Sequence, residues 1–553
     1  MAAAGTSGVT SARTWTRAPK MVGLTGWTVA VVVLGLLAMA AVAYFDLQTN
    51  VLFNDEYGRR WTIEHLASGH GLSLWGTNTG LVQILVALPL GWLHLEPRFF
   101  RLTGLPFLVL CFYFSARLAN RLGADGFWSA VGGFVVAAAP LTLSVATGLM
   151  NETVFLGLLM GACWFGVSWV EEGRGRLWAI GYVLLATLQR QQGAALVPFI
   201  AIALLVTRPR ASRKRDMVAL AGLSAGALLA VKLPSGFHTV TGIGHTVADV
   251  PAGALPGGGA LLGRALVHLA YPVFDLVTLP AILGLVAMPF LVALWPRFES
   301  ERRRTGRLDL LPFALGVFGV LGSLKLIISF GASIFPGNVF GIWGLGPTTL
   351  PNDKPNLFPV ALWVALEALT TATYVVLLLR RRRAWHPQHL GGTGVLLLGL
   401  AVSQLLPVLV YQGAFDRYFL AVLAPLAPVL AVLASRGAGR AGLARPWAVG
   451  AMAAGLLIYV AGQQDYQAWV VARDTAARGL YAQYPADQVY SGVEPIEEHV
   501  WLPAADDQTG TKPKDVRSQP AVALEFAPLG DSRPGVSYWS LAPGRIVIVM
   551  LRR

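Results

Sequence analysis

Long runs of apolar residues, separated by short clusters of arginine, recur along this chain. Of its 553 residues, 55% are hydrophobic and 13% are charged, whereas soluble proteins carry about 25% charged residues. A helical membrane span needs about 20 predominantly apolar residues. Because the short alternating segments of a membrane β-barrel are not found, the pattern predicts an all-α polytopic membrane protein.

The apolar runs predict about 13 transmembrane helices. Their expected positions are 22–44, 102–118, 127–147, 153–170, 176–189, 193–207, 217–233, 276–296, 310–330, 358–379, 391–411, 418–434 and 447–462. Arginine clusters such as RPRASRKR (208–215) and RRRRAWH (380–386) lie between them. Since positive loops stay in the cytoplasm, we expect the N-terminus to be cytoplasmic and the residues after 462 to be extracytoplasmic.

One further apolar run, 81–95, is short and contains Pro89. If it crossed the membrane, the cluster at 208–215 would lie outside, against the charge rule. We therefore predict a helix that lies at the outer interface. Residues 46–101 then form one large outer loop, which contains this helix.

The last part of the chain is less apolar than the rest. QQDYQAWVVARDTAARGLYAQY predicts a helix, and the final GRIVIVMLRR predicts a strand. We therefore divide the chain into a transmembrane domain, 1–462, and a small α/β extracytoplasmic domain, 463–553. No internal repeat of the kind found in many transporters is apparent.

The net charge of +14 is explained by cytoplasmic arginine clusters rather than by nucleic-acid binding. Cys111 and Cys163, the two cysteines, lie inside apolar runs and cannot form a disulfide framework or a cysteine zinc site. The high Ala, Gly and Arg content is typical of a GC-rich bacterial genome. We expect a multi-pass protein of the bacterial cytoplasmic (inner) membrane, surrounded by membrane lipids.

Acidic and basic residues recur in the segments predicted to face outward. They are the pair Asp55–Glu56, Glu152, Arg190 and the pair Asp416–Arg417. A carboxylate can take the proton from an acceptor hydroxyl, and the planar guanidinium of arginine binds phosphate oxygens. With an apolar groove for a lipid tail, these groups suggest glycosyl transfer from a lipid-linked sugar.

The same residues also have simpler structural interpretations. Asp55 and Glu56 can cap a helix that begins near Tyr57, because acids are favoured at helix N-termini. Glu152 can be a solvated loop acid. Arg190 and Arg417 can anchor helix ends at the membrane interface. Spacing alone leaves both interpretations open.

The order of these motifs resembles that of superfamily-C integral membrane glycosyltransferases, within them the family 39-like branch of protein O-mannosyltransferases and aminoarabinose transferases. LFNDEYGRRWTIEHLASGHGLS (52–73) is similar to the family's acidic pair and the element after it. AAAPLTLSVATGLMNETVF (137–155) carries the later acid. LQRQQGAALVP (188–198) has arginine in place of the family's lysine, and DRYFLAVLAP (416–425) resembles its late R-Y element.

This resemblance implies roles for individual residues. Asp55 would be the general base, and Glu56 would position it or hold a cation. The residues implied for substrate binding are Glu152, Arg190, Asp416, Arg417 and Tyr418. The first loop lacks the second acid with which some relatives hold a metal, so we assign no metal ligand and leave dependence on a divalent cation open.

The resemblance further implies a polyprenyl-phosphate sugar as donor and transfer of a hexosyl or pentosyl group on the extracytoplasmic face. The acceptor would be a lipid, a protein or a polysaccharide. A transporter or flippase of a lipid-linked or polar solute is the first alternative, and it predicts essential polar residues near the membrane midplane. A non-catalytic assembly factor or receptor is the second, and it predicts that Asp55→Asn is silent.

Overall fold

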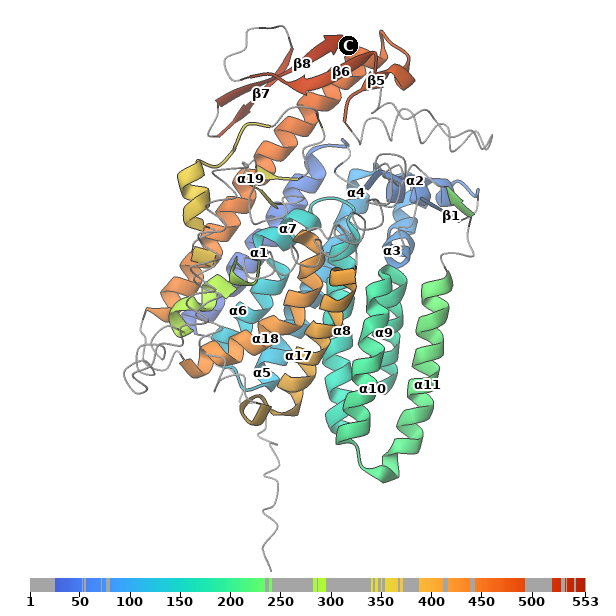
Figure 1. Cartoon of the computed structure of the whole chain (residues 1–553), viewed down its shortest axis with the longest axis vertical. Helices are drawn as coiled ribbons and strands as arrows, with labels where there is room; N and C mark the ends of the chain where they lie inside the picture. Colours follow the sequence, from blue (N-terminus) through green and yellow to red (C-terminus); the bar gives the residue numbers. More distant parts are fainter. Residues whose placement is uncertain are drawn as a thin grey trace, which may run out of the picture.

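A computed structural model of the chain describes residues 25–51, 53, 56–70, 72–75, 80–233, 238–240, 282–285, 287–294, 340–341, 344–346, 350, 354–366, 369–370, 387–410, 416–437, 443–492, 520–528, 533, 535–541 and 544–552. Helices dominate these residues, and a small sheet from the end of the chain lies at one end of the helices (Figure 1). The predicted class, a helical polytopic membrane protein with a small C-terminal α/β part, is confirmed.

The helices of the first half pack into one bundle. In chain order they are α1 (Gly26–Gln48), α2 (Glu56–Ala67), α3 (Leu81–Trp92), α4 (Arg98–Arg101), η1 (Leu102–Gly104), α5 (Leu105–Arg121), α6 (Gly126–Ala137), α7 (Pro140–Ala146), α8 (Asn151–Glu172), α9 (Arg176–Gln189), η2 (Gln191–Ala195), α10 (Leu196–Thr207) and α11 (Arg210–Lys232). Local sequence fixes several ends. The carboxylate of Asp125 accepts a hydrogen bond from the Trp128 N–H at 3.0 Å and caps α6. Gly173, in the left-handed region, ends α8.

The second half adds fewer described helices and most of the strands. The helices are η5 (Met288–Phe290), α17 (Pro387–Val410), η6 (Asp416–Phe419), α18 (Leu420–Gly437), α19 (Ala444–Tyr481) and η8 (Ala486–Gln488). The strands are β1 (Ser73–Trp75), β2 (His238–Val240), β3 (Phe340–Gly341), β4 (Gly344–Leu345), β5 (Val489–Tyr490), β6 (Val522–Phe526), β7 (Val536–Ser540) and β8 (Gly544–Arg552). The C-terminal sheet has the order β5–β6–β8–β7, with β5 parallel to β6 and the other pairs antiparallel. The strand predicted at the end of the chain is therefore present as β8.

Five of the described helices are long and apolar enough to cross a membrane, and the α6–α7 pair would make a sixth. We predicted one span over 127–147, but α6 and α7 are bent by 48°. Pro140 explains the break, because its ring lacks an N–H and holds Ala139 extended (ψ 150°). The predicted span 310–330 lies outside the described residues, and 276–296 and 358–379 are described only in part.

The run at 81–95 forms α3, which is 12 residues long. At 1.5 Å per residue, such a helix is far shorter than a membrane core of about 30 Å. It packs against α2 and lies near the same end of the bundle as the sheet (Figure 1). One contact was not predicted: β1, in the same loop, pairs in parallel with β2 from the segment that follows α11.

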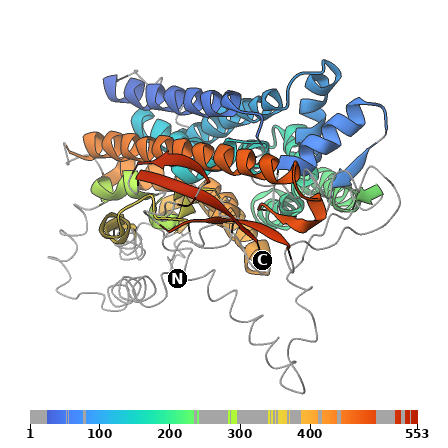
Figure 2. The same cartoon turned by 90° about the horizontal axis from the view of Figure 1, so that it is seen from above.

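The helix α19 is much longer than the span predicted at 447–462, because it continues without a break to Tyr481. It lies along α1 (Figure 2), where the Gln467 side chain donates a hydrogen bond to the Phe45 carbonyl at 2.6 Å. Beyond this point Trp469 stacks on Phe526 of β6. The boundary that we place at 462 falls inside this helix, so the division into two domains stays a prediction.

Two glycines set the close packing of α8 against its neighbours. A Cβ at Gly157 would lie 2.6 Å from the Phe107 carbonyl oxygen of α5, and one at Gly161 would lie 2.3 Å from the Tyr182 ring of α9. Small residues spaced in this way let membrane helices approach closely. By contrast, a Cβ at Gly181 in α9 would meet nothing within 4 Å.

We therefore expect Gly157→Ala to destabilise the protein by about 1–3 kcal/mol, because the added methyl group forces α5 and α8 apart. Gly181→Ala is the matched control, and it should be neutral or stabilising because alanine favours helix. Thermal unfolding of the two purified variants in detergent measures the difference. Equal melting temperatures would show that the α5–α8 contact is looser than described.

Candidate functional site

A buried carboxylate with two arginines lies where α8, α9 and η6 meet. Glu152 is in the first turn of α8, and its Oε1 is 2.7 Å from Arg190 Nη1 and 3.5 Å from Arg417 Nε. Glu152 and Arg417 are buried, and the Arg190 side chain is 16% exposed. The second carboxylate oxygen, Glu152 Oε2, is buried and makes no hydrogen bond within the described part of the chain.

Tyr418 completes this cluster. The guanidinium of Arg190 lies 4.8 Å from the centre of its ring, and that of Arg417 lies 5.5 Å from it. A cation over an aromatic face is stabilised most where water is excluded. Four residues named from the sequence for substrate binding, Glu152, Arg190, Arg417 and Tyr418, therefore lie in contact with one another.

The position of Arg190 follows from the end of α9. Gln189 donates a hydrogen bond to the Asn151 carbonyl at 3.2 Å and accepts one from the Gln83 N–H at 3.0 Å. Gly193 follows in η2, and it packs so closely on α9 that a Cβ added there would lie 2.5 Å from the Thr187 nitrogen. This close approach folds the chain back on α9, so that Arg190 is extended and faces the start of α8.

A third arginine, Arg59 of α2, joins the first loop to the same place. Its Nε donates to Asn151 Oδ1 at 2.7 Å, and its Nη1 donates to the Leu149 carbonyl at 2.7 Å. These acceptors carry no net charge, and the positive charge of Arg59 also acts on the Glu152 carboxylate. Within the described part of the chain, three arginines therefore lie around this one acid.

Glu56, one of the predicted acidic pair, is fully engaged in the structure. Arg101 of α4 holds it from two sides, with Nη2 2.6 Å from Oε1 and Nε 3.0 Å from Oε2. The Leu149 N–H also donates to Oε2 at 3.2 Å. Both residues are buried. Both carboxylate oxygens of Glu56 are therefore bound within the protein, and the contact with Leu149 places the start of α2 beside the start of α8.

Arg101 also fixes the chain before Glu56. It donates to the carbonyls of Asp46, Thr49 and Val51 at 2.6–3.2 Å, and its guanidinium lies 4.3 Å from the centre of the Phe53 ring. Asp55 itself lies outside the described residues. Its described neighbours on both sides are held by this one guanidinium.

Gly148 makes the turn between α7 and α8 possible. Its φ of +104° is unfavourable for any side chain, and a Cβ there would lie 3.2 Å from Glu56 Oε2. Its N–H donates to Asp46 Oδ1 at 2.8 Å. The turn therefore connects the end of α1, the start of α2 and the start of α8.

The structure also leaves some predicted roles untested. Asp416 begins η6 next to Arg417, but its side chain is outside the described part of the molecule. Among the described residues, no group of three or more His, Cys, Asp and Glu side chains is arranged to hold a metal ion. Dependence on a divalent cation therefore stays open.

Sequence reasoning missed Arg59 and Arg101, although each has an indirect signal. Both are arginines in a segment predicted to face outward, where positive charge is not needed for topology. The partners of Arg59 are a backbone carbonyl and an amide, and Arg101 binds three backbone carbonyls besides Glu56, a residue 45 positions away. Neither set of contacts leaves a local pattern in the sequence.

Removal of Arg101 tests whether it holds the loop. Arg101→Gln leaves the Glu56 carboxylate buried without its cation, which should cost about 3–5 kcal/mol of folding free energy. Arg98→Gln on the same short helix is the control, because the ion pair of Arg98 with Glu96 is partly exposed and worth at most about 1 kcal/mol. Arg98 also donates to one carbonyl, that of Leu47, whereas Arg101 donates to three. Tryptophan-monitored thermal unfolding compares them. A control that melts as early as Arg101→Gln would contradict this assignment.

Among known proteins, similarity to this chain is found in solved structures. No family model and no curated protein matches the chain. Two crystal structures of ArnT from Cupriavidus metallidurans are similar to it, one bound to undecaprenyl phosphate and one in the apo state, at 15% and 16% identity. Each match covers 95% of this chain, with 98% and 97% of the ArnT chains, at a TM-score of 0.38. These structures belong to the aminoarabinose-transferase branch that the motifs resemble.

Proposed function

We propose that the protein is a membrane glycosyltransferase that moves a sugar from a polyprenyl-phosphate donor to an acceptor hydroxyl. The observation that carries this proposal is the cluster of Arg190, Arg417 and Tyr418 around Glu152. The cluster brings two guanidinium groups and one carboxylate together, and Arg59 and Glu56 link it to the loop that contains the acidic pair. The order of the sequence motifs supports the same reaction.

The arginines are suited to the phosphate of the donor. Arg190 and Arg417 come from different segments, so their guanidinium groups can approach a phosphate from two directions. Glu152 neutralises part of their charge and keeps both side chains in place. When the bond to the sugar breaks, the leaving phosphate gains negative charge, which these cations stabilise.

Asp55 is the general base in this proposal. The acceptor oxygen forms a bond to the anomeric carbon while the bond from that carbon to the phosphate oxygen breaks. The hydroxyl proton passes to the Asp55 carboxylate, and the polyprenyl phosphate leaves with the electron pair. Glu56 positions the loop through Arg101 and the Leu149 N–H instead of binding substrate.

The location of the cluster favours transfer over transport. Glu152 lies in the first turn of α8, Arg190 at the end of α9 and Arg417 in the short η6 before α18. All three are at helix ends, whereas a carrier site is expected near the membrane midplane, at breaks within helices. The orientation of this end toward the extracytoplasmic side is part of the proposal.

Release of sugar from radiolabelled polyprenyl-phosphate sugars tests the proposal. Purified wild type should transfer label to cell-envelope acceptors from one donor of a panel. Asp55→Asn should lower kcat by about 10²–10⁴-fold, because the base is lost. Arg417→Ala should lower kcat/KM by about 10²–10³-fold, because the leaving phosphate is less stabilised.

Arg174→Ala, an exposed cation of the α8–α9 turn at the other end of the bundle, is the charge-matched control and should keep wild-type activity. Circular dichroism and melting temperature establish that each variant is folded. Consumption of no donor by folded wild type, or full activity of Asp55→Asn, would refute the transferase assignment.

A further inference from the structure

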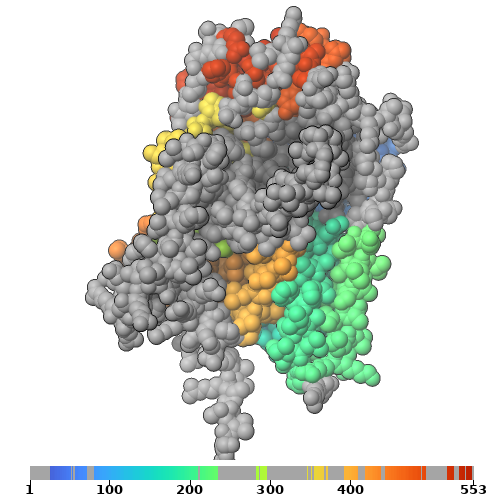
Figure 3. Space-filling view, in the orientation of Figure 1, coloured from blue at the N-terminus to red at the C-terminus, as the bar shows by residue number. Residues whose placement is uncertain are grey.

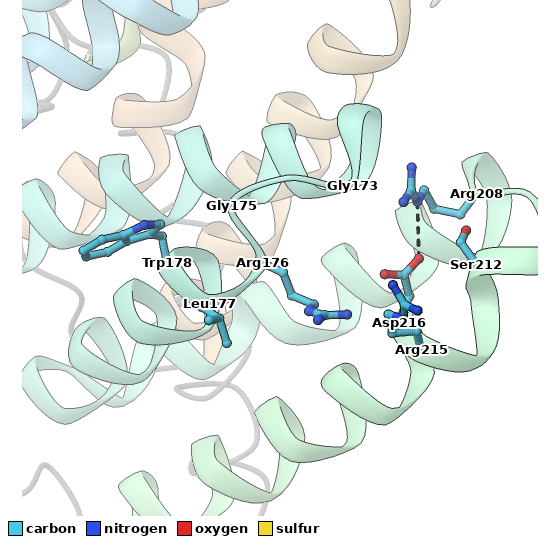
Figure 4. Close-up of a pocket in the computed structure, with 9 residues that line it drawn as sticks. All are labelled: Gly173, Gly175, Arg176, Leu177, Trp178, Arg208, Ser212, Arg215 and Asp216. Atoms are coloured by element: carbon cyan, nitrogen blue, oxygen red, sulfur yellow. Dashed lines mark hydrogen bonds and ion pairs between the residues drawn. The ribbon is translucent and has the colours of Figure 1, made fainter.

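A second group of arginines lines a hollow of about 610 Å³ far from the Glu152 cluster. The hollow lies between the α8–α9 turn and the α10–α11 turn, and Arg176, Arg208 and Arg215 line it (Figure 4). This is the end of the bundle opposite the C-terminal sheet (Figure 1), where α10 and α11 form the visible surface (Figure 3). It is the end that the arginine clusters predict to be cytoplasmic.

The hollow carries more positive than negative charge. Asp216 is the one acid among its lining residues, and both of its oxygens are in use. Trp169 Nε1 donates to Oδ1 at 3.0 Å, and Arg208 Nε donates to Oδ2 at 3.2 Å. Arg176 and Arg215 form no ion pair within the described part of the chain, and Figure 4 shows the Arg176 side chain reaching toward Arg215 and Asp216.

The walls of the hollow are held in place. Gly173 has φ +73°, and a Cβ there would lie 2.3 Å from Arg208 Nη2, so the guanidinium rests against the end of α8. Arg213 donates to the carbonyls of Arg208 and Leu205 at 3.1 and 2.9 Å, which fixes the α10–α11 turn. Arg208 and the backbone of the two turns that carry Arg176 and Arg215 are thus held by contacts within the fold.

Apolar side chains flank the cations on one side. Leu177 is 78% exposed and Trp178 is 64% exposed, and both line the same hollow. Tryptophan prefers the headgroup level of a membrane, where its ring meets both lipid and water. An exposed apolar edge next to a group of solvent-accessible arginines matches a molecule that has a phosphate and hydrocarbon chains.

We propose that this hollow binds the phosphate headgroup of an anionic phospholipid in the adjacent leaflet. The phosphate lies against Arg176 and Arg215, and the acyl chains run along Leu177 and Trp178. The site is separate from the proposed transfer reaction. It adds lipid-dependent stability to the α9–α11 part of the bundle, since a ligand that binds the folded state stabilises it.

Native mass spectrometry of the full chain in detergent tests this site, with phosphatidylglycerol, phosphatidylcholine and inorganic phosphate as probes. Wild type should retain phosphatidylglycerol in preference to phosphatidylcholine. The double variant Arg176→Gln/Arg215→Gln should bind phosphatidylglycerol roughly 30-fold more weakly, if each arginine contributes as an interfacial cation usually does.

The matched control is Arg174→Gln/Lys214→Gln, which removes the same charge from neighbouring exposed positions that do not line the hollow. It should bind phosphatidylglycerol like wild type. An equal loss in both double variants, or a loss in neither, would overturn the site and leave only a general attraction of positive loops to anionic lipid. Arginine-dependent binding of inorganic phosphate without binding of phosphatidylglycerol would overturn the lipid as occupant.

Discussion

The buried ion pair between Arg101 and Glu56 is the contact on which the candidate site depends. The attraction within a buried ion pair offsets the free-energy cost of removing both charges from water only when their remaining hydrogen-bonding groups are also satisfied. Here the guanidinium donates to three carbonyls of the α1–α2 connection as well as to the carboxylate, and Leu149 donates to the carboxylate from the other side. One side chain thus fixes the α1–α2 connection, together with the buried Phe53 ring beneath its guanidinium.

The residues from Leu149 to Glu152 connect the two halves of the site. Leu149 binds Glu56 through its N–H and Arg59 through its carbonyl. Asn151 binds Arg59 and Gln189, and Glu152 binds the arginines proposed to hold the donor phosphate. Because all these contacts come from one helix start, a shift of α8 would move the acidic loop and the arginine cluster together. The proposed base and the proposed phosphate site are therefore mechanically coupled.

Local signals in the sequence predicted much of the fold. Apolar length predicted the long helices, the short run with Pro89 predicted α3, and the apolar segment GRIVIVMLRR at the end of the chain predicted β8. Glu152, Arg190 and Arg417 could be predicted as site residues because they are charged residues at helix ends predicted to face outward, where membrane topology does not require a charge. The contacts of Glu152 with Arg190 and Arg417 could not be predicted from the sequence, because they depend on how distant helices pack. Arg101 binds backbone carbonyls and an acid 45 residues away, and the β1–β2 pair joins two loops, so neither leaves a local pattern in the sequence.

The location of a bound polyprenyl phosphate is the most direct test of the account. The measurement is a cryo-electron microscopy structure of the full chain with that lipid. The account predicts phosphate oxygens within hydrogen-bonding distance, about 3 Å, of both Arg190 and Arg417, with the lipid tail leading away from the loop that carries Asp55. A phosphate bound elsewhere, with both arginines still paired to Glu152, would contradict it.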